Sequence, residues 1–400
     1  MTWPTVKLGQ VMTVGRGSSP RPIKDERFFT GGKIPWVKIA DATASGKFIY
    51  RTNQYVNEYG ASFSRKLQPG ALIFPASGTL GIPRFLGVEA CIHDGWLYFS
   101  DYQGIDPDWL YYRIILLKDY YEGIAYGAAI QNINTDIVRN TEIQLPDIDT
   151  QRAMSAVLCA YDDLIATNQR RIALLEDAAR RLYREWFVHL RFPGHESVPL
   201  KDDVPEGWAK LPLGDVAEIT MGQSPESKYY NTDGDGLPFH QGVSDFGHRF
   251  VKHETYTKQA TRIAEAGNIL CSVRAPVGRL NFTRDKIAIG RGLSAMRSRT
   301  GHQSLLFYQL DALFVEEDMI GGGAIFASVG KKELFGQLIL QPSTSIATTF
   351  NRLVSDLDLQ IENLDSQNQE LAKARDLLLP KLMSGQLDVS GIRLSEEVVI

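Results

Sequence analysis

An internal repeat constrains the fold of this chain more than any other feature. Residues 3–20 align with residues 208–225, and seven of the eighteen aligned positions are identical. The identical pairs are Trp3/Trp208, Leu8/Leu213, Gly9/Gly214, Val11/Val216, Gly17/Gly222, Ser19/Ser224 and Pro20/Pro225. Because long self-similarity at one period marks a duplicated structural unit, the chain is predicted to contain two copies of one domain.

The repeat continues beyond its opening at a slightly shorter offset. Two apolar, strand-like runs between glycines, 69–81 and 266–278, lie 197 residues apart, and the segments WLYY (109–112) and LLFY (305–308) lie 196 apart. A loop insertion or deletion produces such a change of offset. Each copy is therefore predicted to be a mixed strand-and-loop domain of about 140 residues, followed by a helix.

The helix after each copy carries a coiled-coil pattern. In the first helix, apolar or small residues recur in alternating steps of four and three, at Met154, Leu158, Tyr161, Ile165, Asn168, Ile172, Leu175, Ala179, Leu182 and Trp186. A shift of 196 gives the second seam: Phe350, Val354, Leu357, Ile361, Leu364, Asn368, Leu371, Arg375, Leu378 and Leu382. The two helices therefore share one heptad phase.

Two arrangements of these helices are open. Each helix could pack only on its own domain, as most amphipathic helices do. Alternatively, they could pair with each other, and an antiparallel pair would place the two domains at opposite ends of a rod of roughly 50 Å. In the symmetric antiparallel register Asn168 faces Asn368, where the two amides could hydrogen bond. Pro380 is expected to end the second helix earlier than the first.

Composition and charge disfavour several classes of protein. The chain of 400 residues is 44% hydrophobic and 22% charged, which is ordinary for a globular protein, and its net charge of −4 argues against wrapping nucleic acid by charge alone. The cysteines Cys91, Cys159 and Cys271 are scattered, so we expect neither a disulfide framework nor a thiolate zinc site, and a cytoplasmic location fits. Without a signal sequence or a long apolar run, the chain is expected to be neither secreted nor membrane-bound.

Familiar motifs of catalysis and cofactor binding are missing. The sequence has no phosphate-binding GxxxxGK[ST], no HExxH and no GxSxG motif. The glycine segment IGGGAIF (320–326) follows a helix rather than a strand, which disfavours a dinucleotide loop. His240, His248 and His253 lack the spacing of metal ligands. We therefore expect no catalytic residue, no cofactor and no metal on this chain.

Basic residues in loops that contain glycine or proline form the candidate site. Arginine in such loops suits a bidentate grip on guanine or phosphate, although a single basic residue is more often just a solvated charge, so the hypothesis depends on the cluster as a whole. The glycine segments GRGSSP and GQSP themselves are expected to be turns. The candidate DNA-contacting residues are Arg16, Arg21, Lys38, Lys47 and Arg84 in the first copy and Arg274, Arg279, Arg284 and Arg291 in the second.

Three sequence signatures point to a family. Each copy opens with a segment of the type LGDVAEITMGQSP. The first copy is followed by QRRIALLEDAARRLYREWFVHLRFPGHE (169–196), and the second is followed by DLDLQIENLDSQNQELAKARDLLLPKLMSGQLDVS (356–390). Over nearly its whole length the sequence thereby resembles the DNA-specificity subunit of type I restriction-modification enzymes. The resemblance implies an α/β fold, in which two globular mixed α/β target-recognition domains in a pseudo-twofold arrangement are joined by two long antiparallel coiled-coil helices.

The repeat, together with this resemblance, divides the chain into six segments. They are a first target-recognition domain (1–146), a first long spacer helix (147–191), a linker (192–204), a second target-recognition domain (205–342), a second long spacer helix (343–383) and a C-terminal tail (384–400).

The resemblance also implies a function and partners. Each domain would recognise one half of a bipartite, asymmetric site in double-stranded DNA, and the helices would fix the separation of the half-sites. The subunit would be non-catalytic and would recruit two modification subunits, which use S-adenosylmethionine to methylate adenine, and restriction subunits that translocate and cut DNA. No cofactor is expected on this chain itself.

Two other functions remain open from the residues. One is a non-catalytic, two-headed protein-interaction scaffold, which the balanced charge permits and the arginine-bearing loops disfavour. The other is a fused enzyme with unrecognised nuclease or methyltransferase activity, which the missing motifs disfavour. Salt-dependent binding to a specific duplex would identify a DNA reader and exclude the scaffold. Methyl transfer by the chain alone would support the fused enzyme.

Overall fold

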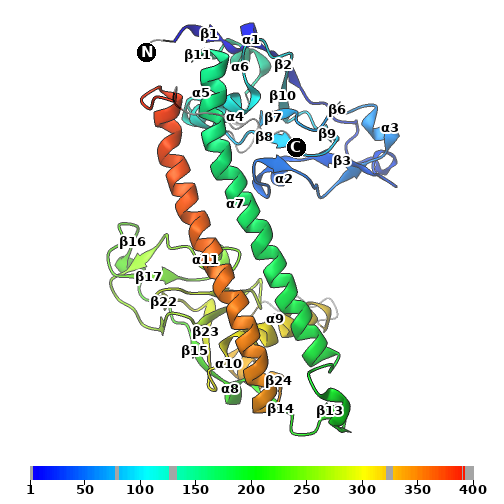
Figure 1. Ribbon diagram of the computed structural model, residues 1–400, viewed down its shortest axis with the longest axis vertical. Coiled ribbons are helices and arrows are strands. Elements are labelled where there is room, and N and C mark those ends of the chain that lie inside the picture. The colour runs from blue at the N-terminus through cyan, green and yellow to red at the C-terminus, as the bar shows by residue number, and fades with distance from the viewer. Residues whose placement is uncertain (1–2, 77–80, 126–132, 321–327, 390, 392–400) are drawn as a thin grey trace. The chain divides into compact units, whose positions relative to one another are not determined.

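The computed structural model describes residues 3–76, 81–125, 133–320, 328–389 and 391. Parts of the strand-like run 69–81, of the glycine segment 320–326 and of the tail 384–400 lie outside this range. The chain forms two compact units, one of Met1–Arg170 with Asp365–Ile400 and one of Arg171–Leu364. The long helices α7 (Ile148–Tyr183) and α11 (Thr344–Met383), which Figure 1 shows, each contribute one part to the first unit and the other part to the second.

The first unit contains two sheets and a strand pair. The five-stranded sheet has the order β2 (Thr13–Arg16), β10 (Trp96–Ser100), β7 (Leu72–Pro75), β8 (Arg84–Leu86), β4 (Phe48–Ile49). The four-stranded sheet has the order β5 (Tyr55–Val56), β3 (Ile34–Val37), β9 (Ala90–Ile92), β6 (Arg65–Leu67). The pair is β1 (Thr5–Lys7) with β11 (Glu142–Gln144). The helices are α1 (Leu8–Val11), α2 (Ile39–Thr43), α3 (Glu58–Ala61), α4 (Pro107–Leu116), α5 (Lys118–Ala125) and α6 (Thr135–Asn140).

The second unit repeats this plan. Its four-stranded sheet has the order β15 (Ala217–Met221), β23 (Leu293–Ser298), β20 (Ile269–Ser272), β21 (Leu280–Phe282). Its five-stranded sheet has the order β16 (Tyr230–Asn231), β18 (Tyr256–Thr257), β17 (Leu237–His240), β22 (Ile287–Ile289), β19 (Ile263–Ala264). The strand pairs are β12 (Leu200–Lys201) with β13 (Val204–Pro205) and β14 (Ala209–Pro212) with β24 (Leu338–Gln341). The helices are α8 (Leu213–Val216), α9 (Gln303–Ile320) and α10 (Lys331–Gly336).

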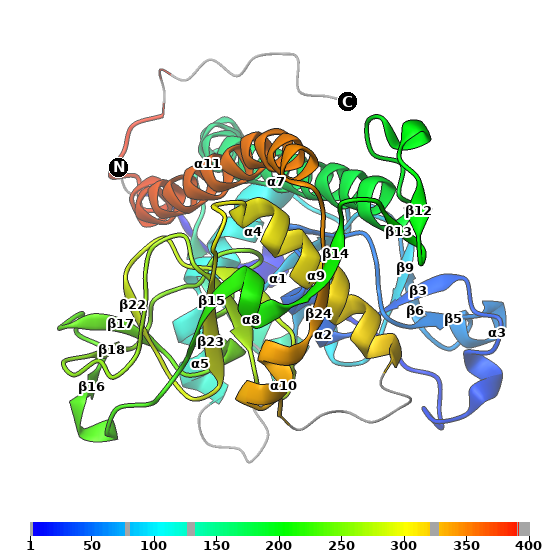
Figure 2. The same cartoon turned by 90° about the horizontal axis from the view of Figure 1, so that it is seen from below.

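The predicted duplication is confirmed by the topology. The antiparallel order β2-β10-β7-β8 returns as β15-β23-β20-β21, and the parallel pair β3/β9 returns as β17/β22. Figure 2 shows α9 of the second unit beside α11, and α9 also contacts β23. There α9 contributes Leu305 and Tyr308 to the same core as Ile269 of β20 and Phe350 of α11. The predicted α/β class with two long helices is therefore correct.

A close backbone approach explains the glycine in the repeated opening. A Cβ atom on Gly17 would lie 2.1 Å from the carbonyl oxygen of His93, and one on Gly222 would lie 2.1 Å from that of Gly290. Both glycines donate equivalent backbone hydrogen bonds, to Trp96 at 2.8 Å in the first unit and to Leu293 at 2.9 Å in the second. These segments are thus not only turns, because a side chain at either glycine would separate two strands.

The predicted seam is confirmed along both helices, since each of its positions is buried or half-buried. In the first unit Met154 packs in one core with Leu382, and eight residues further along α7 Asp162 accepts a hydrogen bond of 2.5 Å from Nη1 of Arg375. In the second unit the rings of Trp186 and Phe350 lie 5.8 Å apart. Within each unit the helix segments therefore pair, and in the first unit these contacts make them antiparallel in the expected register. The alternative that each helix packs on its own domain alone is wrong.

Pro380 does not end the second helix, which corrects the expectation from sequence. Helix α11 continues through Pro380 to Met383, and the amide of Ser384 donates to the carbonyl of Pro380 at 3.1 Å. A proline this close to a helix end removes one intrahelical donor but leaves the last turn intact. The irregular segment lies instead on the first helix, where residues Arg184–Val188 form a π-helix. Among the described residues, no helix has the length and apolarity needed to cross a membrane.

The two seam asparagines are brought to the buried side of the helices but do not form the expected amide pair. Asn168 is 2% exposed. Its Nδ2 atom and the Oδ1 atom of Asn368 are each buried without a hydrogen-bond partner among the described residues. A strict heptad drifts by ~20° per repeat on a straight helix, so the seam alone does not align donor with acceptor.

We predict that Asn168→Leu stabilises the protein by ~1 kcal/mol, because the substitution removes a buried donor that makes no hydrogen bond. Urea unfolding of the full chain measures the change. The matched control is Gln169→Leu on the exposed side of the same helix, which should change the free energy of unfolding by less than ~0.5 kcal/mol. A loss of stability on Asn168→Leu would show that the amide is hydrogen bonded in solution.

Candidate nucleic-acid interface

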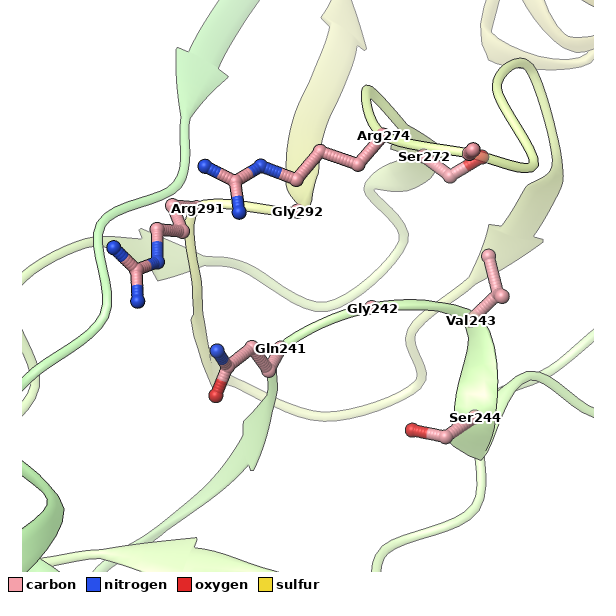
Figure 3. Close-up of a pocket in the computed structure, with 9 residues that line it drawn as sticks. Gln241, Gly242, Val243, Ser244, Ser272, Arg274, Arg291 and Gly292 are labelled. Carbon is pink, nitrogen blue, oxygen red and sulfur yellow. The ribbon is translucent and has the colours of Figure 1, made fainter. Parts of the chain in front are cut away.

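Three loops of the second unit surround a cavity of about 450 Å³. They contribute Gln241 and Ser244 after β17, Arg274 after β20, and Arg291 after β22. A neighbouring cavity of about 450 Å³ shares Gln241 and Arg291 and extends to the segment 222–225 after β15. We call these loops (222–225, 241–244, 272–275 and 290–292) the second loop surface. Figure 3 shows the side chains of Gln241, Arg274 and Arg291 extending toward the same side.

The two glycines that flank Arg291 are required by the backbone. A Cβ on Gly292 would lie 2.3 Å from the carbonyl oxygen of Gln241, and one on Gly290 would lie 2.9 Å from Oγ of Ser224. The amide of Arg291 itself donates to that Oγ at 3.2 Å. Neighbouring loops are therefore in backbone contact on both sides of Arg291, and its exposed side chain extends from a fixed base.

Arg274 and Arg279 flank a turn that Ser272 holds. The hydroxyl of Ser272 donates to the carbonyl of Pro276 at 2.6 Å and accepts from the amide of Arg279 at 2.9 Å. Both arginine side chains are exposed. In the part of the chain that the structure describes, no ion pair holds the guanidinium of Arg274, Arg279 or Arg291, so all three can meet a ligand. Of these, the second loop surface brings together Arg274 and Arg291.

Arg284, the fourth candidate of this unit, is held by the protein. Its guanidinium lies 3.7 Å from the centre of the Phe250 ring, and Nη2 donates to the carbonyl of Glu362 on α11 at 3.3 Å. The side chain is half-buried. Arg284 thus attaches the domain to the helix rather than extending into the second loop surface.

The corresponding surface of the first unit is built around Asp94. Its carboxylate accepts from Oγ of Ser19 at 2.8 Å and pairs with Arg21, while its carbonyl accepts from Nε of Arg16 at 2.7 Å. Partial burial would raise the pKa of Asp94, but Ser19 and Arg21 outweigh it and lower that pKa. Lys38 is exposed, with Nζ 5.4 Å from the centre of the Trp36 ring. Arg16 and Arg21 are therefore brought together, with part of their charge already compensated.

Lys47 and Arg84 are engaged inside the first unit. Nζ of Lys47 lies 2.5 Å from Asp108 and 3.0 Å from Sγ of Cys159, and its side chain is only 9% exposed. Burial alone would lower the pKa of Lys47, but Cys159 and Asp108 raise it above its ordinary value. Arg84 donates through Nε to the carbonyl of Ala42 at 3.0 Å and is half-buried. Both side chains hold the fold together.

Lys47 has an equivalent in the second unit that the sequence search missed. Lys47 accepts through its carbonyl from the amide of Phe85, and Arg249 accepts in the same way from Phe282. Nζ of Lys47 lies 5.4 Å from the Phe85 ring centre, and the guanidinium of Arg249 lies 5.3 Å from that of Phe282. Arg249 also pairs with Glu176 on α7 and Asp358 on α11. The matching segments WLYY and LLFY supply further aromatic rings to these two cations. Their repetition was the sequence signal that could have indicated the equivalence.

Gln241 was also missed, and no sequence pattern marks it. Gln241 follows strand β17 as Lys38 follows β3. The sequence offset between Lys38 and Gln241 differs from the offset between the equivalent strands on either side of them. The loop insertion that shifts the offset therefore hides the equivalence. The side chain of Gln241 is exposed on the second loop surface.

Comparisons with known proteins agree with this architecture. The profile of the family described as "Type I restriction modification DNA specificity domain" matches residues 1–177. The putative type I restriction enzyme MjaX specificity subunit of Methanocaldococcus jannaschii is 31% identical over 294 residues, which cover 71% of this chain and 69% of that protein. The chain belongs to the family of type I restriction-modification DNA specificity subunits.

Other relatives of this specificity subunit match over greater lengths. The type I restriction enzyme MjaIX specificity subunit of M. jannaschii is 24% identical, covering 98% of this chain and 94% of that protein. The crystal structure of the type I restriction-modification S subunit from M. genitalium has the same fold, with a TM-score of 0.61, 14% identity and 96% of each chain covered. Specificity subunits are non-catalytic, and the catalytic activities lie in other subunits. The prediction that this chain is not itself an enzyme is confirmed by its family.

We predict that Lys47→Met lowers the free energy of unfolding by ~1–3 kcal/mol, because it removes the buried ammonium that pairs with the half-exposed Asp108 and keeps the aliphatic stem. Urea unfolding measures the loss. The control Lys38→Met, at an exposed position, should stay within ~0.5 kcal/mol of the parent. Unchanged stability with weaker DNA binding would instead make Lys47 a DNA contact.

Proposed function

We propose that this specificity subunit reads a bipartite, asymmetric site in double-stranded DNA, one half with each domain. The observation that carries the proposal is a pair of equivalent loop surfaces with different chemistry. Strand register places Val37 opposite Ile92 and His240 opposite Ile289. Lys38, the residue after Val37, is therefore equivalent to Gln241, the residue after His240. Asp94, two residues after Ile92, is equivalent to Arg291, two residues after Ile289.

The exposed side chains suit the recognition of base edges. Arginine donates two parallel hydrogen bonds to the O6 and N7 atoms of guanine, and glutamine can pair with the N6 and N7 atoms of adenine. Gln241, Arg274 and Arg291 offer both kinds of contact, whereas the first domain offers Lys38 and the pair of Arg16 and Arg21. Equivalent positions with unlike donors and acceptors favour two unlike half-sites. The DNA-contacting set that we propose is Arg16, Arg21, Lys38, Gln241, Arg274, Arg279 and Arg291.

We further propose that the paired helices set the distance between the half-sites. A seam of 33 residues corresponds to roughly 50 Å of helix. Readers on one face of B-DNA are spaced by about one turn, roughly 10 bp, so half-sites of ~3–4 bp leave a gap of about 6 bp. In this proposal the subunit works in the cytoplasm, recruits two modification subunits that carry S-adenosylmethionine, and is joined by restriction subunits that translocate DNA.

We predict that Arg274→Ala and Arg291→Ala relax the base preference at one half-site only. Loss of a bidentate contact should cost ~1–3 kcal/mol at one position, whereas loss of a phosphate contact would weaken binding to all sequences alike. Methylation-sensitive sequencing of DNA from cells that express the subunit with its modification partner reports the motif directly.

The matched control is Arg299→Ala. Arg299 follows Ser298, which pairs with Ala217 at the end of β15 opposite to the second loop surface, and its guanidinium pairs with Glu218. This variant should leave the motif unchanged. If Arg274→Ala and Arg291→Ala also leave both affinity and motif unchanged, these arginines are solvated charges, and a chain that binds no specific duplex at any salt concentration would be a protein scaffold.

We predict that inserting one heptad into both helices, after residue 168 in α7 and at the facing position of α11, lengthens the gap between the half-sites. Seven residues add ~10 Å of helix, which corresponds to about 3 bp of DNA. The same sequencing experiment measures the gap. A modified site with unchanged spacing would contradict the role of the helices as a spacer.

A further inference from the structure

Behind the second loop surface lies a chain of four titratable side chains. Nδ1 of His240 lies 3.0 Å from Oδ2 of Asp245, and Nε2 of His240 lies 2.9 Å from Nδ1 of His253. Nε2 of His253 in turn lies 3.0 Å from Oδ2 of Asp285. Neither the proposed base contacts nor the packing of the helices uses these residues.

His240 and Asp245 enclose the loop that carries Gln241. The loop 241–244 has His240 at its start and Asp245 at its end, so the contact between these two residues closes it. The carbonyl of His240 accepts from the amide of Gly290 at 2.8 Å, and the backbone of Gln241 lies against Gly290 and Gly292. A displacement of the His240 ring would therefore also displace Gln241 and the backbone of Arg291.

The hydrogen bonds of this chain require one proton more than two neutral imidazoles carry. Each of the three contacts needs one ring proton, because ionised carboxylates only accept. Two neutral rings supply two protons, so a complete chain contains one imidazolium. His240 is fully buried, and burial lowers its pKa even though Asp245 opposes the effect. The additional proton therefore belongs on His253, which donates inward to His240 and outward to Asp285.

Among the residues that the structure describes, no further side chain is hydrogen bonded to or ion-paired with either ring, and the charged neighbours of His253 in sequence, Lys252 and Glu254, are exposed. The carboxylates that contact them are Asp245, on the short helix Val243–Asp245, and Asp285, on the turn after β21. The adjoining strands β18 and β22 contain only Tyr256–Thr257 and Ile287–Ile289, which have no group that titrates near neutral pH. Asp285 is 62% exposed, so water can replace its contact with His253.

We propose that His240, Asp245 and His253 are positioning residues for the base-reading loop of the second domain, and that protonation of His253 tightens this domain's discrimination between bases. The proposal rests on the proposed function of the loop in DNA reading. A neutral His253 carries one ring proton and can donate only one hydrogen bond. It then donates either to His240 or to Asp285, and donation to Asp285 leaves the His240 ring without this support. Discrimination at the second half-site is therefore present at low pH and lost as the pH rises.

The first domain provides an internal control. Val37 stands where the second domain has His240, and its following loop is fixed without histidine: the amide of Lys38 donates to Asp41 at 2.8 Å, and Asn53 donates to the same carboxylate at 3.1 Å. Asp41 is 4% exposed. One histidine, His93, does lie beside Asp94, but burial lowers its pKa and its Nδ1 accepts from the amide of Gly95 at 2.8 Å, which favours the neutral ring. The base preference of the first half-site should therefore change little over the upper part of the histidine range.

The test measures competition between the modified motif and duplexes with one mismatch, for the full chain with its modification partner, from about pH 5.5 to about pH 8.5. A mismatch in the second half-site should be tolerated about 5- to 10-fold better at the high end, which is the scale of one net hydrogen bond. A mismatch in the first half-site should show a nearly constant ratio. His253→Gln should fix the second ratio at its high-pH value. Parallel changes at both half-sites, or a pH dependence that survives His253→Gln, would overturn the proposal.

A second measurement separates this proposal from the proposed function. Nitrogen-15 spectra of the histidine rings in the free chain at about pH 6 should show a neutral His240 protonated at Nδ1 and an imidazolium at His253. Asp285→Asn should weaken the imidazolium signal without displacing His240. Two neutral rings in the parent would refute the positioning unit whatever the DNA experiments give. Failure of specific DNA binding with these signals intact would refute the reading function instead.

Discussion

Among the contacts that attach each domain to the long helices, one hydrogen bond is shared by both repeats. In the first unit the hydroxyl of Tyr112 on α4 donates to Asp162 on α7 at 2.6 Å, and in the second that of Tyr308 on α9 donates to Asp358 on α11 at 3.1 Å. Burial raises the pKa of both tyrosines, so each remains a donor. Because a carboxylate in this environment needs its donors, rotation of the helix about its axis would be costly. The bond therefore fixes the phase of the helix relative to the domain.

Each of these aspartates receives a second donor, and its origin differs between the units. Arg375 of α11 donates to Asp162, which ties one long helix to the other in the first unit. Arg249, which belongs to the domain itself, pairs with Asp358 in the second unit. Carboxylates at equivalent positions thus have different second roles: Asp162 fixes the pairing of the helices in the first unit, and Asp358 fixes the docking of the domain in the second. If the helices act as a spacer, both bonds are needed, because a spacer conveys distance only when its ends are rigidly attached.

The sequence predicted the repeated framework well and the local environment of its charges poorly. The duplication and the heptad seam depend on periodic apolar residues, which report burial directly, and both were found. Lys47 and Arg291 look alike in sequence, since each is a basic residue close to glycine and apolar strands. Only the fold places Lys47 over the rings of Tyr111 and Tyr112 and leaves Arg291 free between two close-packed glycines. The contact of His240 with His253 was equally hidden, because strand pairing supplies it.

The backbone framework beneath the two loop surfaces does not depend on the side chains that would read DNA. Gly17 and Gly222 pack against carbonyl oxygens, and the strand register that orders the loops is a backbone property. Asp94 and Arg291 can therefore occupy equivalent positions without any change in the framework. With a net charge of −4 the chain gains little from neutralising phosphates, and Asp94 offsets part of the positive charge in the first domain. In the proposed reading function, the contribution of this chain to a DNA complex would then come mainly from the shape and hydrogen bonding of these loops, which is the part of recognition that distinguishes one base from another.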